Sequence, residues 1–217
     1  MHKGISTNPG PQPPGQTRRH PVFLLLGEPL ALDLVNTLVP PEFGGDLIAA
    51  PAMTREWLRL EASRLPAEAR NPPDVRQLAA LRKALSGLFA AVLDGVSPPA
   101  AFLRTVNAAS RAGAGYLELE WTASGVRALA HPARRAGKSG PGVMHLAEVA
   151  RSGIQLLASP DSYRLRRCEG PGCTLLFVAT NPQRRWCAPY LCGNRARVAR
   201  HYRRTRSVAV GAVQPLS

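Results

Sequence analysis

The chain has 217 residues, of which 45% are hydrophobic, and it carries a formal charge of +14. This length and apolar content suffice for a globular core, but no apolar run approaches the roughly 18–20 residues that span a bilayer. We therefore expect no membrane partner. Because no apolar stretch follows the first basic residues, we also expect a cytoplasmic protein with reduced thiols.

The N-terminal part predicts a tail and two helices. Residues 1–20 are rich in proline, glycine and glutamine, and we expect them to be disordered. The ordered part opens with "GEPLALDLVNTL", where Leu30, Leu34 and Leu38 repeat at helical spacing. A short second helix is predicted over "REWLRLEASRL", with Thr54 as its N-cap.

The middle of the chain predicts two further helices, a hairpin and a last long helix. Asp74 is the predicted N-cap of a long helix that ends at Gly95, and the next helix follows Ser97 and two prolines. The stretch "GYLELEWTASGVRALA" alternates around a Ser-Gly turn, which is typical of a β-hairpin. After a polar connection, "VMHLAEVARSGIQLLAS" again has a helical pattern.

These elements predict a mainly helical α+β domain with one hairpin over residues 21–160. A small basic module is expected at residues 161–206, and residues 207–217 are expected to form a tail.

One polar group in the first helix is a candidate ligand site. Asp33, Asn36 and Thr37 share a helix face amid apolar residues. They either form a polar strip that faces solvent or caps a neighbouring loop, or they line a pocket for an unknown small-molecule effector. The sequence has no phosphate-binding loop, dinucleotide fingerprint or nucleophile–base arrangement, so we do not expect an enzyme.

All four cysteines lie close together near the C-terminus. Four residues separate Cys168 from Cys173 and Cys187 from Cys192, and thirteen separate the two pairs. Two such pairs on short turns can place four thiolates around one Zn²⁺. Disulfides are rare in a reducing compartment, redox pairs favour a shorter spacing, and the pattern matches neither ferredoxin motif. We expect structural Zn²⁺ that contributes folding energy.

The residues around the cysteines predict a treble-clef-like zinc finger with four cysteine ligands. Between the pairs, "TLLFV" is a predicted strand that "TNPQ" turns back toward "RRWC", and a helix is expected from about Gly193. Val198 and Tyr202 lie one helical turn apart, and we expect them to pack on the strand and on Trp186.

Positive charge is concentrated in the same module. Residues 164–206 contain eleven arginines and one acid, Glu169, which gives +10 of the total +14. Such an excess is typical of nucleic-acid-binding proteins, although a solvated basic face has the same composition. A basic helix suits the major groove of duplex DNA, and specific reading by one short helix favours a homodimer. The predicted nucleic-acid contacts are Arg184, Arg185, Asn194, Arg195, Arg197, Arg200, Arg203 and Arg204. Asn194 is also typical of a left-handed turn.

The motif "RRWC-x4-CGNR", preceded by the first cysteine pair, resembles the CGNR zinc finger of bacterial proteins. The upstream "GEPLALDLVNTL", "GDLI" and "REWL" are similar to the ABATE domain that accompanies this finger, so the resemblance covers nearly all of residues 21–206. It implies a stress-induced transcription regulator that binds DNA through the finger. It also implies that the zinc ligands are Cys168, Cys173, Cys187 and Cys192.

Three functional classes remain open from the sequence. The first is a zinc-dependent DNA-binding transcription regulator, in which the N-terminal domain senses an effector or dimerises. The second is an RNA-binding or ribosome-associated zinc protein. The third is a protein–protein adaptor in which zinc is only a scaffold. Binding to phosphates weakens strongly with salt, which separates the first two classes from the third.

Overall fold

The computed structural model describes the chain in four stretches, and for residues 203–211 it describes the backbone alone. These stretches are residues 23–66, 72–113, 115–132 and 142–211. The predicted disordered tail, residues 1–20, lies outside the described residues.

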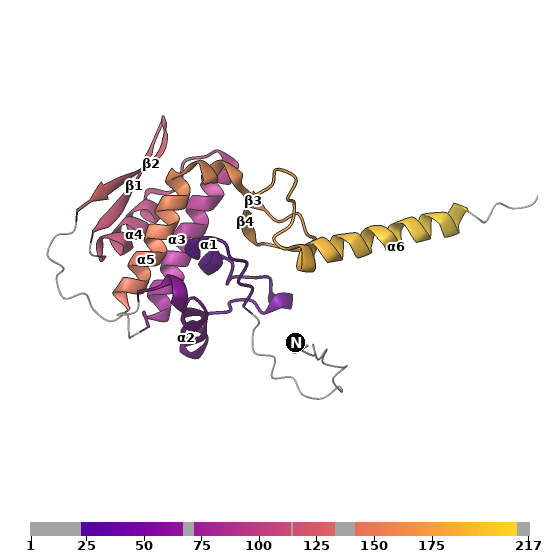
Figure 1. Ribbon diagram of the computed structural model, residues 1–217, viewed down its shortest axis with the longest axis horizontal. Coiled ribbons are helices and arrows are strands. Elements are labelled where there is room, and N and C mark those ends of the chain that lie inside the picture. The colour runs from indigo at the N-terminus through magenta and orange to yellow at the C-terminus, as the bar shows by residue number, and fades with distance from the viewer. Residues whose placement is uncertain (1–22, 67–71, 114, 133–141, 212–217) are drawn as a thin grey trace, which may run out of the picture.

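Two long helices form the centre of the N-terminal body (Figure 1). They are α3 (Val75–Asp94) and α5 (Val143–Ala158), and both pack against the short α1 (Leu30–Val35) and against α4 (Ala100–Arg111). Asp74 caps α3 as predicted, because its carboxylate accepts the N–H of Arg76 at 2.7 Å.

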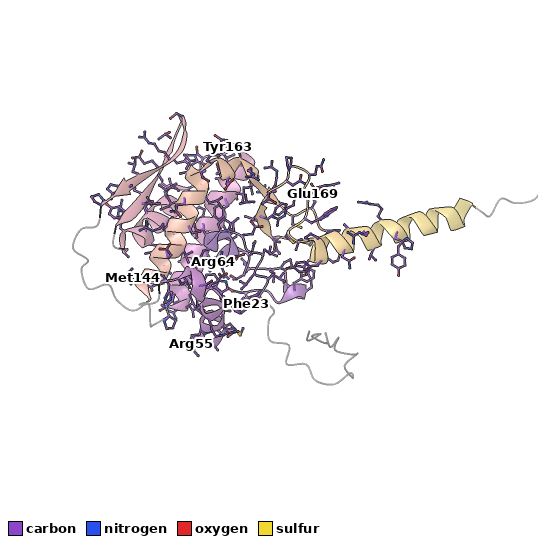
Figure 2. All side chains as sticks on the ribbon, viewed as in Figure 1. Phe23, Arg55, Arg64, Met144, Tyr163 and Glu169 are labelled. Atoms are coloured by element: carbon purple, nitrogen blue, oxygen red, sulfur yellow. The ribbon has the colours of Figure 1, made fainter. Side chains whose placement is uncertain are left out.

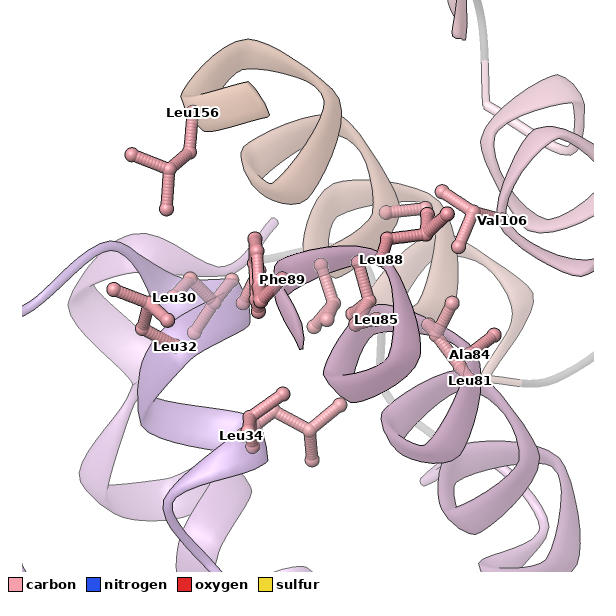
Figure 3. Packing of buried hydrophobic residues seen from close by; sticks show 14 of the residues in the cluster. Leu30, Leu32, Leu34, Leu81, Ala84, Leu85, Leu88, Phe89, Val106 and Leu156 are labelled. Atoms are coloured by element: carbon pink, nitrogen blue, oxygen red, sulfur yellow. The ribbon is translucent and has the colours of Figure 1, made fainter. Parts of the chain in front are cut away.

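The apolar faces of these helices meet in one core (Figure 3). Leu32 and Leu34 from α1 and Leu85 and Phe89 from α3 are fully buried. Burial of an apolar side chain of this size contributes about 1.5–3 kcal/mol, so this core supplies much of the stability of the helical body.

Helix α1 is shorter than the leucine spacing predicts. It ends at Val35, and Leu38, the third leucine of the repeat, is 53% exposed. The hydroxyl of Thr37 donates to the carbonyl of Leu34 at 2.7 Å. Hydrogen bonds of this kind compete with the helical pattern and favour an early end.

The predicted start of the second helix is also wrong. Helix α2 (Pro51–Leu60) begins before Thr54, with Pro51 in its first turn, where a missing N–H costs nothing. Thr54 lies inside the helix, and its hydroxyl donates to the carbonyl of Ile48 at 3.1 Å.

The predicted hairpin is confirmed. It consists of β1 (Tyr116–Thr122) and β2 (Gly125–His131), which pair antiparallel. The side chain of Asn107 in α4 holds the middle of β1, because its amide donates to the carbonyl of Leu119 at 3.0 Å and its oxygen accepts the N–H of Leu119 at 2.8 Å.

The C-terminal part is a small hairpin followed by a long helix. Strand β3 (Leu165–Arg167) pairs antiparallel with β4 (Leu176–Val178), and α6 (Asn194–Gly211) follows a short turn. The partner of the predicted strand in "TLLFV" is therefore β3, which precedes the first cysteine, and not the segment "RRWC". The α+β class with a small four-cysteine finger is confirmed.

Helix α6 extends away from the rest of the molecule (Figure 1). It continues past Arg206 to Gly211, so the expected tail at residues 207–217 is helical in its first part. In the part of the chain that the structure describes, no helix is both long and apolar enough for a membrane crossing.

Candidate metal centre and nucleic-acid interface

Four sulfur atoms converge at one point in the finger. Cys168 and Cys173 lie on the loop between β3 and β4, whereas Cys187 precedes the turn before α6 (Pro189–Gly193) and Cys192 lies in it. Their Sγ atoms all lie within 4.8 Å of one another, and those of Cys187 and Cys192 are 3.6 Å apart. Zinc–sulfur bonds of about 2.3 Å in a tetrahedron place sulfurs about 3.8 Å apart, so the four residues fit Zn²⁺.

The first loop needs glycine because its backbone approaches the sulfurs closely. A Cβ at Gly170 would lie 2.7 Å from the Sγ of Cys192, and Gly172 has a φ of 69°. The N–H groups of Gly170 and Cys187 point at the Sγ of Cys168, at 3.4 and 3.3 Å. These donors stabilise negative charge on the sulfur, as a zinc thiolate requires.

The four thiols cannot all ionise without a cation. Burial raises the pKa of Cys168 to about 11. A hydrogen bond from the thiol of Cys187 lowers the pKa of Cys173 to about 5, and the same bond raises the pKa of Cys187 far above its ordinary value. A divalent cation removes this conflict by stabilising all four thiolates together.

The sulfur cluster belongs to a second apolar core. Cys168, Cys187 and Cys192 pack with Leu175 and Phe177 of the finger, and Val39 and Leu47 from the loop after α1 join them. The finger is therefore packed directly on the N-terminal part of the chain.

Buried hydrogen bonds fasten strand β4 to α1. The side-chain amide of Asn36 donates to the carbonyl of Leu176 at 3.0 Å, and its oxygen accepts the N–H of Leu176 at 2.9 Å. The carboxylate of Glu28 accepts the N–H of Val178 at 2.8 Å. The predicted boundary near residue 160 stays a prediction, but packing and hydrogen bonds cross it.

The polar strip predicted as an effector site has structural partners. Asn36 binds β4, Thr37 accepts a hydrogen bond from Arg82 at 2.9 Å, and Asp33 pairs with Arg64 at 2.5 Å. The cavity that the three residues line is too small to hold a water molecule. The arrangement agrees with the capping interpretation and gives the effector interpretation no support.

Arg184, one of the predicted nucleic-acid contacts, is directed into the protein. Its guanidinium pairs with Glu28 at 2.8 Å and lies 4.3 Å from the centre of the Phe177 ring. It also donates to the carbonyl groups of Val178 and Cys187, at 3.1 and 2.5 Å. These contacts make Arg184 a structural residue that joins the finger to the start of α1.

Other arginines of the basic module also have acidic partners. Arg164 pairs with Asp161 and Arg167 with Asp94, at 3.1 and 3.0 Å. Arg185 pairs with Glu169, whose place on the finger loop is shown in Figure 2. Most of these acids lie outside residues 164–206. The net charge of +10 counted for that segment therefore overstates the positive charge near the hairpin.

The charge of α6 is not offset in this way. Arg197 and Arg200 are exposed, and within the described part of the chain neither has an acidic partner. Arg203 and Arg204 belong to the same helix, but their side chains lie outside the described residues. The helix sequence "NRARVARHYRRTRSVAVG" contains six arginines and no acid.

The start of α6 differs from the sequence interpretation in two ways. Asn194 has helical φ and ψ of −66° and −46°, so the predicted left-handed conformation at this residue is wrong. Val198 and Tyr202 are 45% and 64% exposed, because α6 leaves the finger instead of packing along it.

Arg195 lies closer to the metal centre than the other helix arginines. Its guanidinium donates to the Sγ of Cys192 at 2.9 Å and lies 5.0 Å from the centre of the Phe43 ring. Sequence reasoning missed both Phe43 and the buried Glu28. The one available signal for Glu28 was a lone acid directly after an apolar run, "FLLLGEP".

Comparisons with known families agree with this architecture. The ABATE model, described as "Putative stress-induced transcription regulator", matches residues 28–160. The CGNR zinc finger model matches residues 164–205. A search of curated proteins found no significant match.

Proposed function

Since the chain belongs to the ABATE family and carries a CGNR zinc finger, we propose that it is a DNA-binding transcription regulator that requires zinc. In this proposal α6 contacts duplex DNA. The N-terminal domain senses an effector or forms a homodimer, and it has no catalytic role.

The observation that carries the proposal is the unbalanced charge of α6. Most arginines near the β3–β4 hairpin are paired with acids, and Arg166 donates to carbonyl groups, whereas Arg197 and Arg200 are exposed on a helix without acids. Arginines in the first turns of a helix oppose its dipole, so they disfavour the helix in isolation. Phosphate groups at the same place reverse that effect, because arginines and helix dipole then attract the same anion.

The shape of α6 suits a DNA groove. Its 18 residues extend about 27 Å at 1.5 Å per residue, and the major groove is about 12 Å wide. The helix projects from the finger (Figure 1), so little of the body lies beside its outer part. When bound, zinc would fix the turn from which α6 starts, through Cys187 and Cys192.

A titration in salt tests the proposal. The zinc-loaded full-length chain is added to a random pool of duplex DNA at rising salt, and the bound sequences are selected and read. We expect log K to fall steeply with log[salt] and the selection to yield a preferred motif. Binding that does not respond to salt would instead favour the adaptor class.

Two exposed aromatic residues favour RNA as a second candidate. Tyr190 and Tyr202 are 68% and 64% exposed, although Tyr202 was expected to pack on the strand and on Trp186. Exposed aromatic rings near arginines can stack on unpaired bases. Competition of labelled duplex DNA with a structured RNA that has single-stranded loops separates the two candidates, since the RNA should displace the DNA only if RNA is the preferred ligand.

A further inference from the structure

A cavity of about 250 Å³ lies between the N-terminal domain and the finger. Its walls come from parts of the chain that are far apart in sequence. Val39 and Phe43 belong to the loop after α1, Leu175 precedes β4, and Leu191 and Arg195 come from the turn and the first residues of α6. A molecule in this cavity would touch both domains at once.

The cavity is lined largely by apolar side chains, and three of the four clustered cysteines also line it. Leu24, Val39, Pro40 and Leu175 provide aliphatic surface, and Cys173, Cys187 and Cys192 lie beside them. Ligand sites usually combine such apolar walls with a few polar groups that fix orientation. For an anionic occupant the part toward the interior must be apolar, because a negative charge there would face the thiolates.

The rim carries a cation with unused donors. Arg195 is exposed and donates one N–H to the Sγ of Cys192, and within the described residues it pairs with no carboxylate. A guanidinium has five N–H donors in a fixed fork that matches a carboxylate. The ring of Phe43, 5.0 Å from the guanidinium carbon, holds this group at the cavity edge.

From this arrangement we propose that the cavity binds a small organic carboxylate with an apolar body, of the size of benzoate. The apolar body occupies the space between Val39 and Leu175, and the carboxylate accepts hydrogen bonds from Arg195. The side-chain amide of Asn194, which also lines the cavity, offers a further donor.

The site replaces the effector pocket that the sequence suggested at Asp33, Asn36 and Thr37. It lies where the loop after α1 meets the first residues of α6. An occupant would contact both, so it would influence the orientation of α6 relative to the N-terminal domain. That an occupant regulates DNA binding rests on the proposed function. Binding of the carboxylate itself does not, and the test below contains no DNA.

Binding is measured by isothermal titration calorimetry on the zinc-loaded full-length chain. Benzoate is compared with benzamide, which has the ring without the charge, and with acetate, which has the charge without the ring. We expect benzoate to bind one molecule per chain, and both other compounds to bind at least about 10-fold more weakly. Equal binding of benzoate and benzamide, equal binding of benzoate and acetate, or no saturable binding below about 10 mM would overturn the proposal.

Two variants locate the site, and each has a matched control. Arg195→Gln should weaken benzoate binding by about 10-fold, whereas Arg185→Gln, on the finger but outside the cavity, should not. Phe43→Ala should also weaken binding, whereas Tyr163→Ala, an exposed ring outside this cavity (Figure 2), should not. Zinc content is measured for every variant. If the controls weaken binding as much as the cavity variants do at full zinc content, benzoate binds elsewhere and the assignment is wrong.

Discussion

Arg184 and Arg185 are neighbours in sequence with the same charge, but their surroundings differ. Arg184 is partly buried and contacts Glu28, three carbonyl groups and an aromatic ring, whereas Arg185 is exposed and pairs with Glu169. Breaking a buried ion pair is costly because the remaining charge loses its partner, whereas an exposed pair contributes little. At the residue scale, burial decides which arginines are structural.

This difference predicts that Arg184→Gln lowers the free energy of unfolding by about 2–3 kcal/mol and speeds zinc loss to a chelator. Arg185→Gln, the matched control, should change it by less than about 1 kcal/mol. Chemical denaturation and a colorimetric zinc-release assay measure both quantities. Equal effects of the two variants would contradict the structural role of Arg184.

Asp33 gives a prediction about pH. Burial raises its pKa from the ordinary 3.8 to about 6, although Arg64 opposes the shift. A folded-state pKa above the unfolded value means that the folded state binds the proton more tightly. The resulting stabilisation is present below pH 3.8 and is lost as the pH rises through 6.

Asp33→Asn should therefore gain stability over the wild type as the pH rises. Between pH 5 and pH 7, the difference in free energy of unfolding should move by about 1 kcal/mol in favour of the variant. Denaturant titrations at several pH values with saturating zinc measure it. Asp161→Asn, a change at an exposed acid, serves as the control and should run parallel to the wild type. A constant difference between Asp33→Asn and the wild type would exclude the raised pKa.

At the scale of elements, two strands are held in the same way. Asn36 binds both backbone groups of Leu176 in β4, and Asn107 binds both backbone groups of Leu119 in β1. Each asparagine takes the place of a neighbouring strand for one residue. Short two-stranded sheets are marginally stable alone, so these side chains help to fix them on the helices.

The two asparagines therefore act as controls for each other. Asn36→Ala should leave two buried backbone groups of β4 without partners and cost about 2–3 kcal/mol. In the Asn36→Ala variant, amide hydrogen exchange should accelerate at Leu176 and not at Leu119. In the Asn107→Ala variant, it should accelerate at Leu119 and not at Leu176. Equal acceleration of exchange at both strands in either variant would show that each asparagine does not act on its own strand alone.

Helix α6 provides the test of the DNA interface. Exchanging Arg197 and Arg200 for glutamine should weaken DNA binding and reduce the slope of log K against log[salt] by about 2, while zinc stays bound. A control with the same loss of charge is Arg59→Gln with Arg127→Gln, at exposed positions on the helical body. An unchanged slope in the α6 variant would exclude this surface, and equal slopes in both variants would indicate an effect of net charge alone.

At the scale of the whole molecule, the finger and the helical body share apolar surface. Leu165, Leu176 and Val178 of the finger belong to the same buried cluster as Leu34 and Phe89. Zinc binding therefore stabilises more than the residues between the cysteines. Removal of the metal should expose part of the helical core as well.

Cys187→Ser tests this coupling. It should reduce zinc binding and disorder the finger, and it should also lower the midpoint of thermal unfolding of the helices by about 5–10 °C. Circular dichroism at 222 nm follows the helices. Added zinc should restore the midpoint of the chelator-treated wild type but not that of the variant. An unchanged helical midpoint would show that the two parts fold independently.

The sequence by itself determined the four-cysteine cluster, the hairpin β1–β2 and the helices α3 and α5. Each of these depends on local patterns: a spacing of cysteines, an alternation around a turn, or a cap followed by a long apolar stripe. Such patterns require only the chemistry of neighbouring residues, so they can be recognised without the rest of the fold.

The tertiary structure alone decided the end of α1, the strand that pairs with β4, and the roles of Arg184, Asn36 and Glu28. It also brought the loop at Val39 and Phe43 beside Arg195 to form the cavity. These features join residues that are far apart in the chain, and burial changes the energy of the same charged or polar group by several kcal/mol. A sequence states which groups are present, but only packing decides which of them lose water and which stay free to bind a partner.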